Sequence, residues 1–219
     1  MIRSDTTATQ ATTHTDRQRA LGVLDATYAD EKRWVRKARD MFPSSDLDDD
    51  RITWVVAMVD GEPAGVLRVH YDPPLHLYRE YGLEALEKAA DVDVDAFLRD
   101  HRIAEIGRFA VRPAFRRRLC VVFELMRVAA VDTLQRDFTH YVTDVFEGEE
   151  HSPYQFHTRV LGFRPVAVHQ TGEMDCLHRR ITLILNLKEA YQRLRASKNR
   201  LYTLIADGLS ERRRQQLAA

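Results

Sequence analysis

Residues 104–121 hold most of the side chains in this sequence that could do chemistry. The stretch reads AEIGRFAVRPAFRRRLCV, so a carboxylate at Glu105 precedes Arg108 and then three consecutive arginines, Arg116–Arg118. A carboxylate on a strand can accept the proton of an amine if partial burial raises its pKa toward neutrality. Arginine side chains at the start of a helix bind phosphate, and the helix dipole adds to that attraction. The spacing therefore favours proton transfer next to an anion-binding turn.

The same residues also have simpler interpretations. Glu105 could form a structural ion pair with Arg108 or Arg68 instead of acting as a base. The three consecutive arginines could be a solvated basic turn, or a docking patch for an acidic partner. His157 and Tyr154 are candidates for a general acid, although a helix histidine is more commonly structural.

The elements that must position these residues alternate between strand and helix patterns. Turn signals separate alternating or continuous apolar runs that predict strands at 52–59, 63–71, 103–111, 139–146, 163–169 and 179–187. Apolar residues at three- and four-residue steps predict helices at 17–41, with a break near Asp30, and at 118–136 and 153–161. This order predicts an α/β fold: a mixed central sheet flanked by helices, with a helical C-terminal extension.

We expect one main domain over residues 16–187, preceded by a disordered tail over 1–15 that lacks an apolar period. A polar, partly helical insertion occupies about 72–102. Its apolar side chains could roof a pocket; they are Leu75, Leu77, Tyr78, Tyr81, Leu83, Leu86 and Phe97. The extension, 188–219, continues an apolar stripe expected to pack on the domain or to form a homodimer surface: Leu187, Tyr191, Leu194, Leu201, Leu204 and Ile205.

Composition narrows the class of protein. The 33 basic and 33 acidic residues give a formal net charge of zero, which argues against a dedicated nucleic-acid binder. The two cysteines, Cys120 and Cys176, lack ligand spacing, so we expect no zinc or other metal site and interpret Cys120 as packing. No apolar run approaches the roughly 20 residues of a membrane span, and we expect a cytoplasmic protein.

Residues 104–121 resemble the GNAT superfamily of acyltransferases, in which this strand binds a pantetheine arm and the following turn holds its phosphate. The resemblance implies that an acyl thioester contacts Phe109, Ala110, Val111, Arg116, Arg117, Arg118, Leu119, Cys120 and Val121. Both glycines of the family's Gln/Arg-x-x-Gly-x-Gly/Ala turn are replaced here. The single phosphodiester of a carrier-protein phosphopantetheine makes fewer demands on such a turn than the pyrophosphate of coenzyme A.

Further motifs resemble the acyl-homoserine-lactone synthase and N-acyl amino acid synthase branch of that superfamily. Residues 105–111 are similar to its Glu-x-Ser-Arg-Phe strand, and Arg68 in GVLR is similar to its Gly-x-x-Arg. Trp34, before an acidic loop, resembles part of its acceptor-side segment. The sequence FHTRVLGF at 156–163 resembles its Phe-Tyr-x-x-x-Leu-Gly-Phe ending, with His157 or Thr158 at the tyrosine position.

The resemblance implies an N-acyltransferase that moves an acyl group directly from an acyl-carrier-protein or acyl-CoA thioester to a small amine such as an amino acid. No tightly bound cofactor is expected. The implied residues are Glu105, Arg108 and His157 for catalysis, and Trp34, Arg68 and Tyr154 for substrate binding. Alternatives are a catalytically silent GNAT-like module that binds acyl thioesters or a protein partner, and a weaker hypothesis of RNA binding through residues 116–118 and 212–214.

Overall fold

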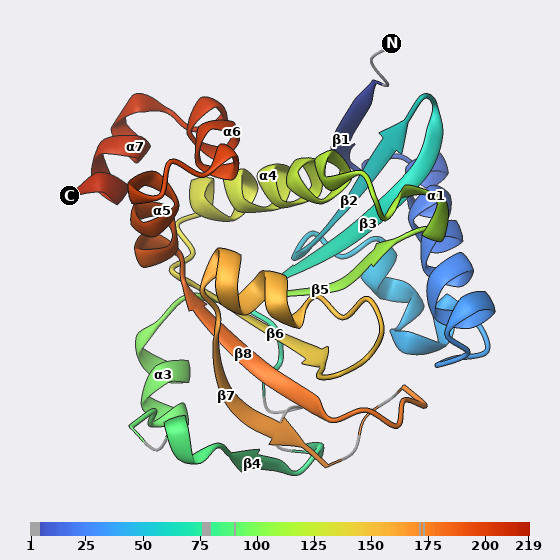
Figure 1. Cartoon of the computed structure of the whole chain (residues 1–219), viewed down its shortest axis with the longest axis horizontal. Coiled ribbons are helices and arrows are strands. Elements are labelled where there is room, and N and C mark those ends of the chain that lie inside the picture. Colours follow the sequence, from blue (N-terminus) through green and yellow to red (C-terminus); the bar gives the residue numbers. More distant parts are fainter. Residues whose placement is uncertain (1–4, 76–79, 90, 171, 173) are drawn as a thin grey trace.

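The computed structural model describes residues 5–75, 80–89, 91–170, 172 and 174–219, which form an eight-stranded sheet with helices on both faces (Figure 1). The strands are β1 (Thr6–Gln10), β2 (Ile52–Val59), β3 (Glu62–Tyr71), β4 (Leu83–Ala85), β5 (Ile103–Val111), β6 (His140–Phe146), β7 (Arg164–His169) and β8 (Arg180–Asn186). The helices are α1 (His14–Leu24), α3 (Val94–Asp100), α4 (Leu119–Gln135), α5 (Leu187–Ala196), α6 (Arg200–Gly208) and α7 (Glu211–Ala218). This is the mixed α/β sheet that the sequence predicts.

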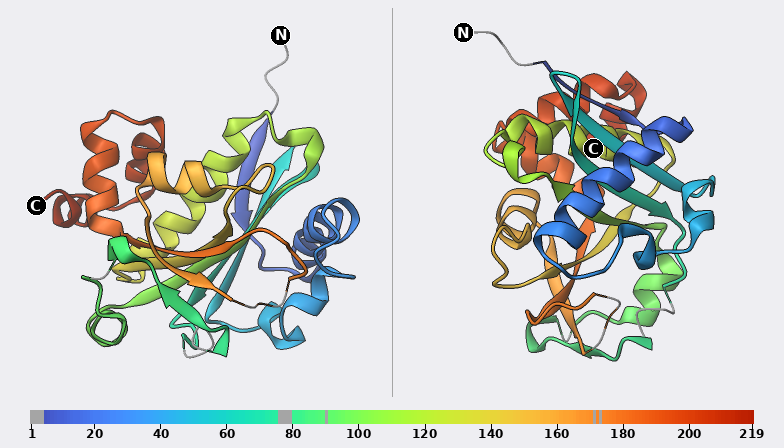
Figure 2. Two further views of the ribbon diagram at one scale, coloured as in Figure 1. Left: turned by 60° about the horizontal axis from the view of Figure 1, so that its bottom comes forward. Right: turned by 90° about the vertical axis from the view of Figure 1, so that its right-hand side faces the viewer.

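Two helices cover the opposite faces of the N-terminal half of the sheet (Figure 2). Helix α4 packs on β1, β2, β3 and β5 through an apolar face in which Val121 and Leu125 are fully buried. Helix α1 packs on β2, β3 and β5 from the other side. The C-terminal helices extend the α4 layer, because α6 packs on α4 and both α6 and α7 pack on α5. Their apolar stripe is mostly buried within the chain, so it serves internal packing.

The helix predicted over 17–41 with a break near Asp30 is interrupted near the predicted position, because helical structure stops at Glu31, but no long helix follows the break. Helix α1 ends at Leu24 and continues as one π-helical turn, Asp25–Glu31. The Asp25 carboxylate then accepts a hydrogen bond from the Ala38 amide at 2.6 Å, which folds the chain back. Two short 3₁₀ turns, Ala38–Met41 and Ser44–Leu47, lead into β2.

The prediction of a disordered tail over residues 1–15 is wrong for residues 5–15, which the structure describes. Thr6–Gln10 form β1, which pairs antiparallel with β2, and α1 begins at His14 behind a Thr13 N-cap. The sequence lacks an apolar period here because an edge strand buries few side chains. Ala8 is the one residue of β1 that is buried, against the core of the α4 face.

Strands β5 and β6 run parallel, whereas the other neighbouring pairs in the sheet are antiparallel. Their pairing covers three residues of each strand, Ile103–Glu105 and His140–Val142, although β5 is nine residues long. Further along, the register of β5 against β3 shifts between the partners of Val66 and Arg68, and Arg108 adopts a positive φ of 49°. This bulge turns β5 away from β6, so the two strands diverge.

The insertion predicted at 72–102 adds to the far edge of the sheet. Its short strand β4 pairs with β7, and Leu83 and Leu86 pack near Val166 in a small separate apolar cluster. These side chains therefore do not roof a pocket, whereas Tyr81 and Pro74 line the main cavity. Leu77 and Tyr78 lie outside the described residues.

The position of β1 predicts different effects for neighbouring substitutions. We expect Ala8→Asp to lower the free energy of unfolding by about 2 kcal/mol or more, because it buries a charge in the core. Thr9→Asp places the same charge on the exposed side of the strand and is expected to stay within about 0.5 kcal/mol of wild type. Urea unfolding of both variants checks this, and equal stabilities contradict the assignment of β1.

Candidate active site

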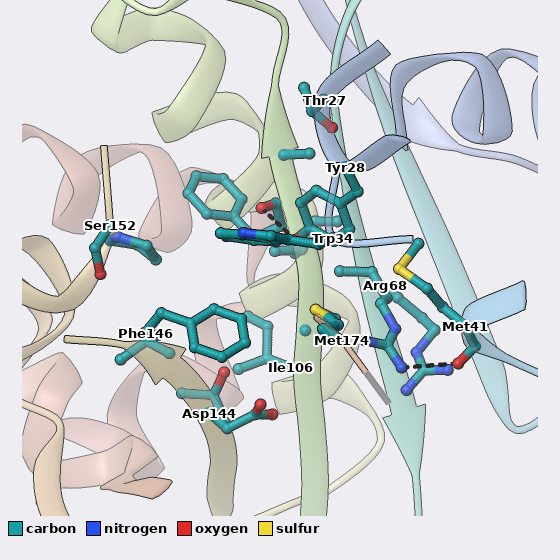
Figure 3. Close-up of a pocket in the computed structure, with 18 of the residues that line it drawn as sticks. Thr27, Tyr28, Trp34, Met41, Arg68, Ile106, Asp144, Phe146, Ser152 and Met174 are labelled. Carbon is teal, nitrogen blue, oxygen red and sulfur yellow. Dashed lines mark hydrogen bonds between the residues drawn. The ribbon is translucent and has the colours of Figure 1, made fainter. Parts of the chain in front are cut away.

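A cavity of about 600 Å³ opens where β5 and β6 diverge (Figure 3). Residues of β3, β5 and β6 line it, together with the segment after α1, the start of α4 and the loop after β6. Most of the residues implied by the resemblance meet here. The ones that line the cavity are Trp34, Arg68, Glu105, Arg108, Phe109, Ala110, Val111, Arg116, Leu119 and His157.

Arg68 forms the centre of a buried cluster of charges on one wall. The guanidinium donates from Nη1 to Asp46 at 2.9 Å and from Nη2 to Glu105 at 2.6 Å. Arg68 is 5% exposed, and both carboxylates are largely covered. The ion pair between Glu105 and Arg68, one of the two interpretations open from the sequence, is therefore present. Two carboxylates around one guanidinium leave this cluster with a formal charge of −1.

The bulge on β5 shapes the floor of the cavity. Gly107 contributes no side chain, and the strained backbone at Arg108 turns its side chain so that Nη2 donates to the Met41 carbonyl at 3.0 Å. Tyr28 donates from its hydroxyl to the Phe109 carbonyl at 3.0 Å. Burial raises the pKa of Tyr28 to about 12, so the phenol stays neutral and keeps this bond.

The basic turn before α4 is more heavily paired than the sequence suggests. Arg116 forms a two-pronged ion pair with Glu31 and donates from Nε to the Val111 carbonyl at 3.1 Å. Arg118 lies 3.6 Å from Asp60, outside the cavity. Arg117 is exposed, and no described carboxylate pairs with it. Of the three arginines at this turn, Arg116 and Arg118 thus lie next to carboxylates of the chain, and Arg117 faces solvent.

The first residues of α4 also separate into two groups. Leu119 lines the cavity and is 64% exposed. Cys120 instead places its Sγ 3.3 Å from the Thr6 hydroxyl, and Val121 is buried beneath Gly65, so neither lines the cavity. No side chain caps the start of α4, and the Val121 amide donates to the Arg118 carbonyl at 3.0 Å. The amide groups of Leu119 and Cys120 are the ones that can bind an anion.

His157 reaches the cavity and Tyr154 does not. His157 is 2% exposed, and its ring is tilted against Phe163 and edge-on to Phe109. Burial lowers its pKa to about 4. Its Nδ1 lies 2.9 Å from the Pro153 carbonyl, which can only accept, so the ring proton sits on Nδ1 and Nε2 carries the lone pair. Tyr154 packs against the core of the α4 face.

A short strap, residues 28–34, contributes Tyr28, Lys32 and Trp34 to the lining of the cavity. The Trp34 ring lies between Tyr28 and Phe146, with centroid distances of 5.4 and 4.8 Å (Figure 3). Lys32 forms an ion pair with Glu149 in the loop after β6, and its ammonium lies 5.1 Å from the Trp34 ring. The strap therefore joins the two sides of the divergence through aromatic and charged contacts.

Sequence reasoning missed a second buried ion pair in the cavity, between Asp144 and Arg180. Asp144 is the one charged residue in the seven-residue strand β6, whose remaining residues are mostly apolar. A charge inside a buried strand was the available signal, because such a residue needs a partner. Within the described ranges, no group of His, Cys, Asp and Glu side chains could hold a metal, and no helix is suited to crossing a membrane.

Neutral His157 makes stability depend on pH. Its pKa is near 6.5 in the unfolded chain and about 4 in the folded protein, so the unfolded chain binds the proton first as pH falls. The stability contributed by neutral His157 is therefore complete above about pH 6.5 and is lost as pH falls toward 4. In His157→Asn, the amide keeps a donor for Pro153 but does not titrate.

We expect His157→Asn to lose about 2 kcal/mol less stability than wild type between pH 7 and pH 4.5, as measured by urea unfolding. The exposed His151→Asn is the matched control and is expected to follow wild type. The same pH dependence in all three proteins would show that His157 is not buried as a neutral ring.

Known proteins resemble this chain in both sequence and structure. The family described as N-acyl amino acid synthase FeeM matches residues 11–173. The solved structure of FeeM, an N-acyl amino acid synthase from uncultured soil microbes, superposes with a TM-score of 0.68 and 14% identity, covering 90% of this chain and 98% of that one. No curated protein sequence gives a significant match.

Two acetyltransferases share the fold at lower similarity. The ribosomal-protein-S18-alanine N-acetyltransferase from Escherichia coli has a TM-score of 0.50 and 14% identity, over 84% of this chain and 94% of that one. An acetyltransferase from Streptococcus agalactiae has a TM-score of 0.55 and 11% identity, over 83% and 98%. The diverging strands and the uncapped α4 thus belong to a GNAT fold, and the protein is an N-acyltransferase. The chain belongs to the N-acyl amino acid synthase FeeM family.

Proposed function

We propose that this enzyme transfers an acyl group directly from the thioester of an acyl carrier protein or of coenzyme A to the amine of a small acceptor such as an amino acid. The observation that carries the proposal is the Asp46–Arg68–Glu105 cluster, which faces the cavity at the divergence of β5 and β6. Its two carboxylates can accept hydrogen bonds from an ammonium group on this wall. The name of the matching family supports an amino acid as acceptor.

Glu105 is assigned the role of base. The carboxylate takes one ammonium proton, directly or through a water, and the amine nitrogen then forms a bond to the carbonyl carbon of the thioester. The carbon–sulfur bond breaks and the thiolate leaves. The nitrogen loses its second proton as the amide forms, and water carries that proton to the thiolate. Arg68 keeps the Glu105 carboxylate in place through its 2.6 Å bond, and Asp46 offsets the charge of Arg68.

Backbone groups of Phe109 to Val111 are assigned to the thioester carbonyl. These residues line the cavity, and past Glu105 no described residue of β5 pairs with β6. Amide groups that face such a gap can stabilise the oxyanion of the transition state. Neutral His157 has its ring proton committed to Pro153, so we assign the proton for the leaving thiolate to water.

The phosphate of the donor is placed at the start of α4. Uncapped amide groups and the exposed Arg117 support this position for either donor. A carrier protein would also meet the basic side chains of this turn from outside the cavity. The prediction of a cytoplasmic location rests on the sequence alone.

Replacement of the base tests the mechanism. We expect Glu105→Gln to lower kcat at least about 100-fold, because the amide cannot accept the ammonium proton. The measurement is thiol release from octanoyl carrier protein and from octanoyl-CoA with each proteinogenic amino acid, with mass spectrometry of the N-acyl product. The same isosteric change in Glu124→Gln, on the far side of α4, is the control. Wild-type kcat in Glu105→Gln would remove Glu105 from the mechanism.

The donor site gives a separate prediction. We expect Arg117→Gln to raise the KM of the thioester roughly 3- to 10-fold and to leave kcat unchanged, because one exposed charge–phosphate contact is lost. The effect should shrink as salt is raised to 0.5 M. Arg212→Gln, an exposed arginine on α7, is the matched control. An unchanged KM for both donors at low salt would place the phosphate elsewhere.

A further inference from the structure

The Asp144–Arg180 ion pair occupies the wall opposite Arg68. Asp144 lies on β6 and Arg180 begins β8, and their side chains are 17% and 9% exposed. Both line the cavity, and Figure 3 shows the Asp144 carboxylate pointing into it below Phe146. The pair is therefore a feature of the same cavity that holds Glu105.

The register of the sheet places the two carboxylates on one face. Glu105 pairs with Val142, and side chains of directly paired residues point to the same face of a sheet. Two residues further on, Gly107 and Asp144 occupy the same face, because side chains alternate along a strand. The register between Glu105 and Gly107 precedes the shift at Arg108. Glu105 and Asp144 thus face one cavity, and Gly107 adds no side chain between them.

The electrostatic surroundings link this pair to the centre of the cavity. Tyr28, whose hydroxyl binds the Phe109 carbonyl, has a pKa raised mainly by burial and also by the charge of Asp144, while Arg180 acts in the opposite direction. A carboxylate offers about four acceptor positions, so it can bind a guanidinium and other donors at the same time. Buried ion pairs contribute little net stability, since desolvation offsets the attraction. The stability of the fold therefore does not explain why this pair is present, whereas ligand binding does.

We propose that Asp144 binds the ammonium group of the acceptor from the side opposite Glu105, and that Arg180 is a positioning residue that holds the Asp144 carboxylate in this orientation. The inference rests on the proposed function, because it assigns a second carboxylate to the acceptor site. The ligand class is a protonated primary amine. Glu105 takes the proton, and Asp144 holds the nitrogen while the proton leaves.

Equilibrium binding separates this inference from turnover. The probe is the amino acid that wild type binds best among the twenty proteinogenic ones, measured by calorimetry. We expect Asp144→Asn to weaken its binding roughly 10- to 100-fold, because a charged hydrogen bond is lost. The N-acetyl derivative of the same amino acid has no charge on its nitrogen and is expected to bind within about 2-fold of wild type. A merely structural role would weaken both ligands alike.

Matched variants cover the risk of misfolding. Arg180→Gln is expected to weaken amino-acid binding, and Arg180→Lys to recover part of it. The double variant Asp144→Asn/Arg180→Gln removes both charges together, so no unpaired charge stays buried. The exposed pair Arg179–Glu147 links the same strand ends at 2.9 Å, so Glu147→Gln is the control and should bind normally.

Wild-type amino-acid affinity in the double variant, or equal weakening of both ligands in Asp144→Asn, would overturn the inference. Failure of the proposed function has a different signature. In that case wild type releases no thiol with any acceptor, whereas Asp144-dependent binding of the charged amino acid is still observed.

Discussion

The active site depends on the short length over which β5 and β6 pair. The two strands share three residue pairs and then separate, because the register of β5 shifts at the strained backbone of Arg108. A continuous parallel ladder would satisfy the backbone groups of both strands and close the sheet. The divergence instead exposes strand edges to a cavity that Glu105 on one strand and Asp144 on the other both line. A local backbone irregularity thereby creates a space in the middle of the sheet.

Several charged side chains line the cavity among apolar ones, and most of these charges occur in ion pairs. Arg68 holds two carboxylates, and separate ion pairs join Arg180 to Asp144, Lys32 to Glu149 and Arg116 to Glu31. Pairing lowers the cost of removing these groups from water. It also fixes their orientation before any substrate arrives, which is the condition under which charged groups assist a reaction. Around this cavity, opposite charges therefore lie in direct contact within a chain whose formal net charge is zero.

Local patterns in the sequence predict helices and strands better than they predict the contacts between distant segments. Strands β2 and β5 lie at the predicted positions, because apolar residues bounded by turns determine them. Strand β1 was missed, since its stability comes from pairing with β2, about 50 residues away. Glu105, Arg68 and His157 were found through motifs and do meet in the cavity. Arg116 forms an ion pair with Glu31, which is 85 residues away, so no local pattern in the sequence predicts it. The sequence of a phosphate-binding turn is the same whether its arginine is in an ion pair or faces solvent.

Helices α5, α6 and α7 follow residue 173, where the family match ends, and α6 packs on α4. Helix α4 lies between the sheet and the C-terminal helices, so the wall that begins at Leu119 is braced on two sides. The opposite wall, residues 25–47, consists of one π-helical turn and two 3₁₀ turns held by side-chain contacts. In the proposed binding mode, the thioester therefore meets a wall that is packed on two sides, and the acceptor meets a wall built from short turns. Acceptors of different size are then expected to displace residues 25–47 more than the start of α4.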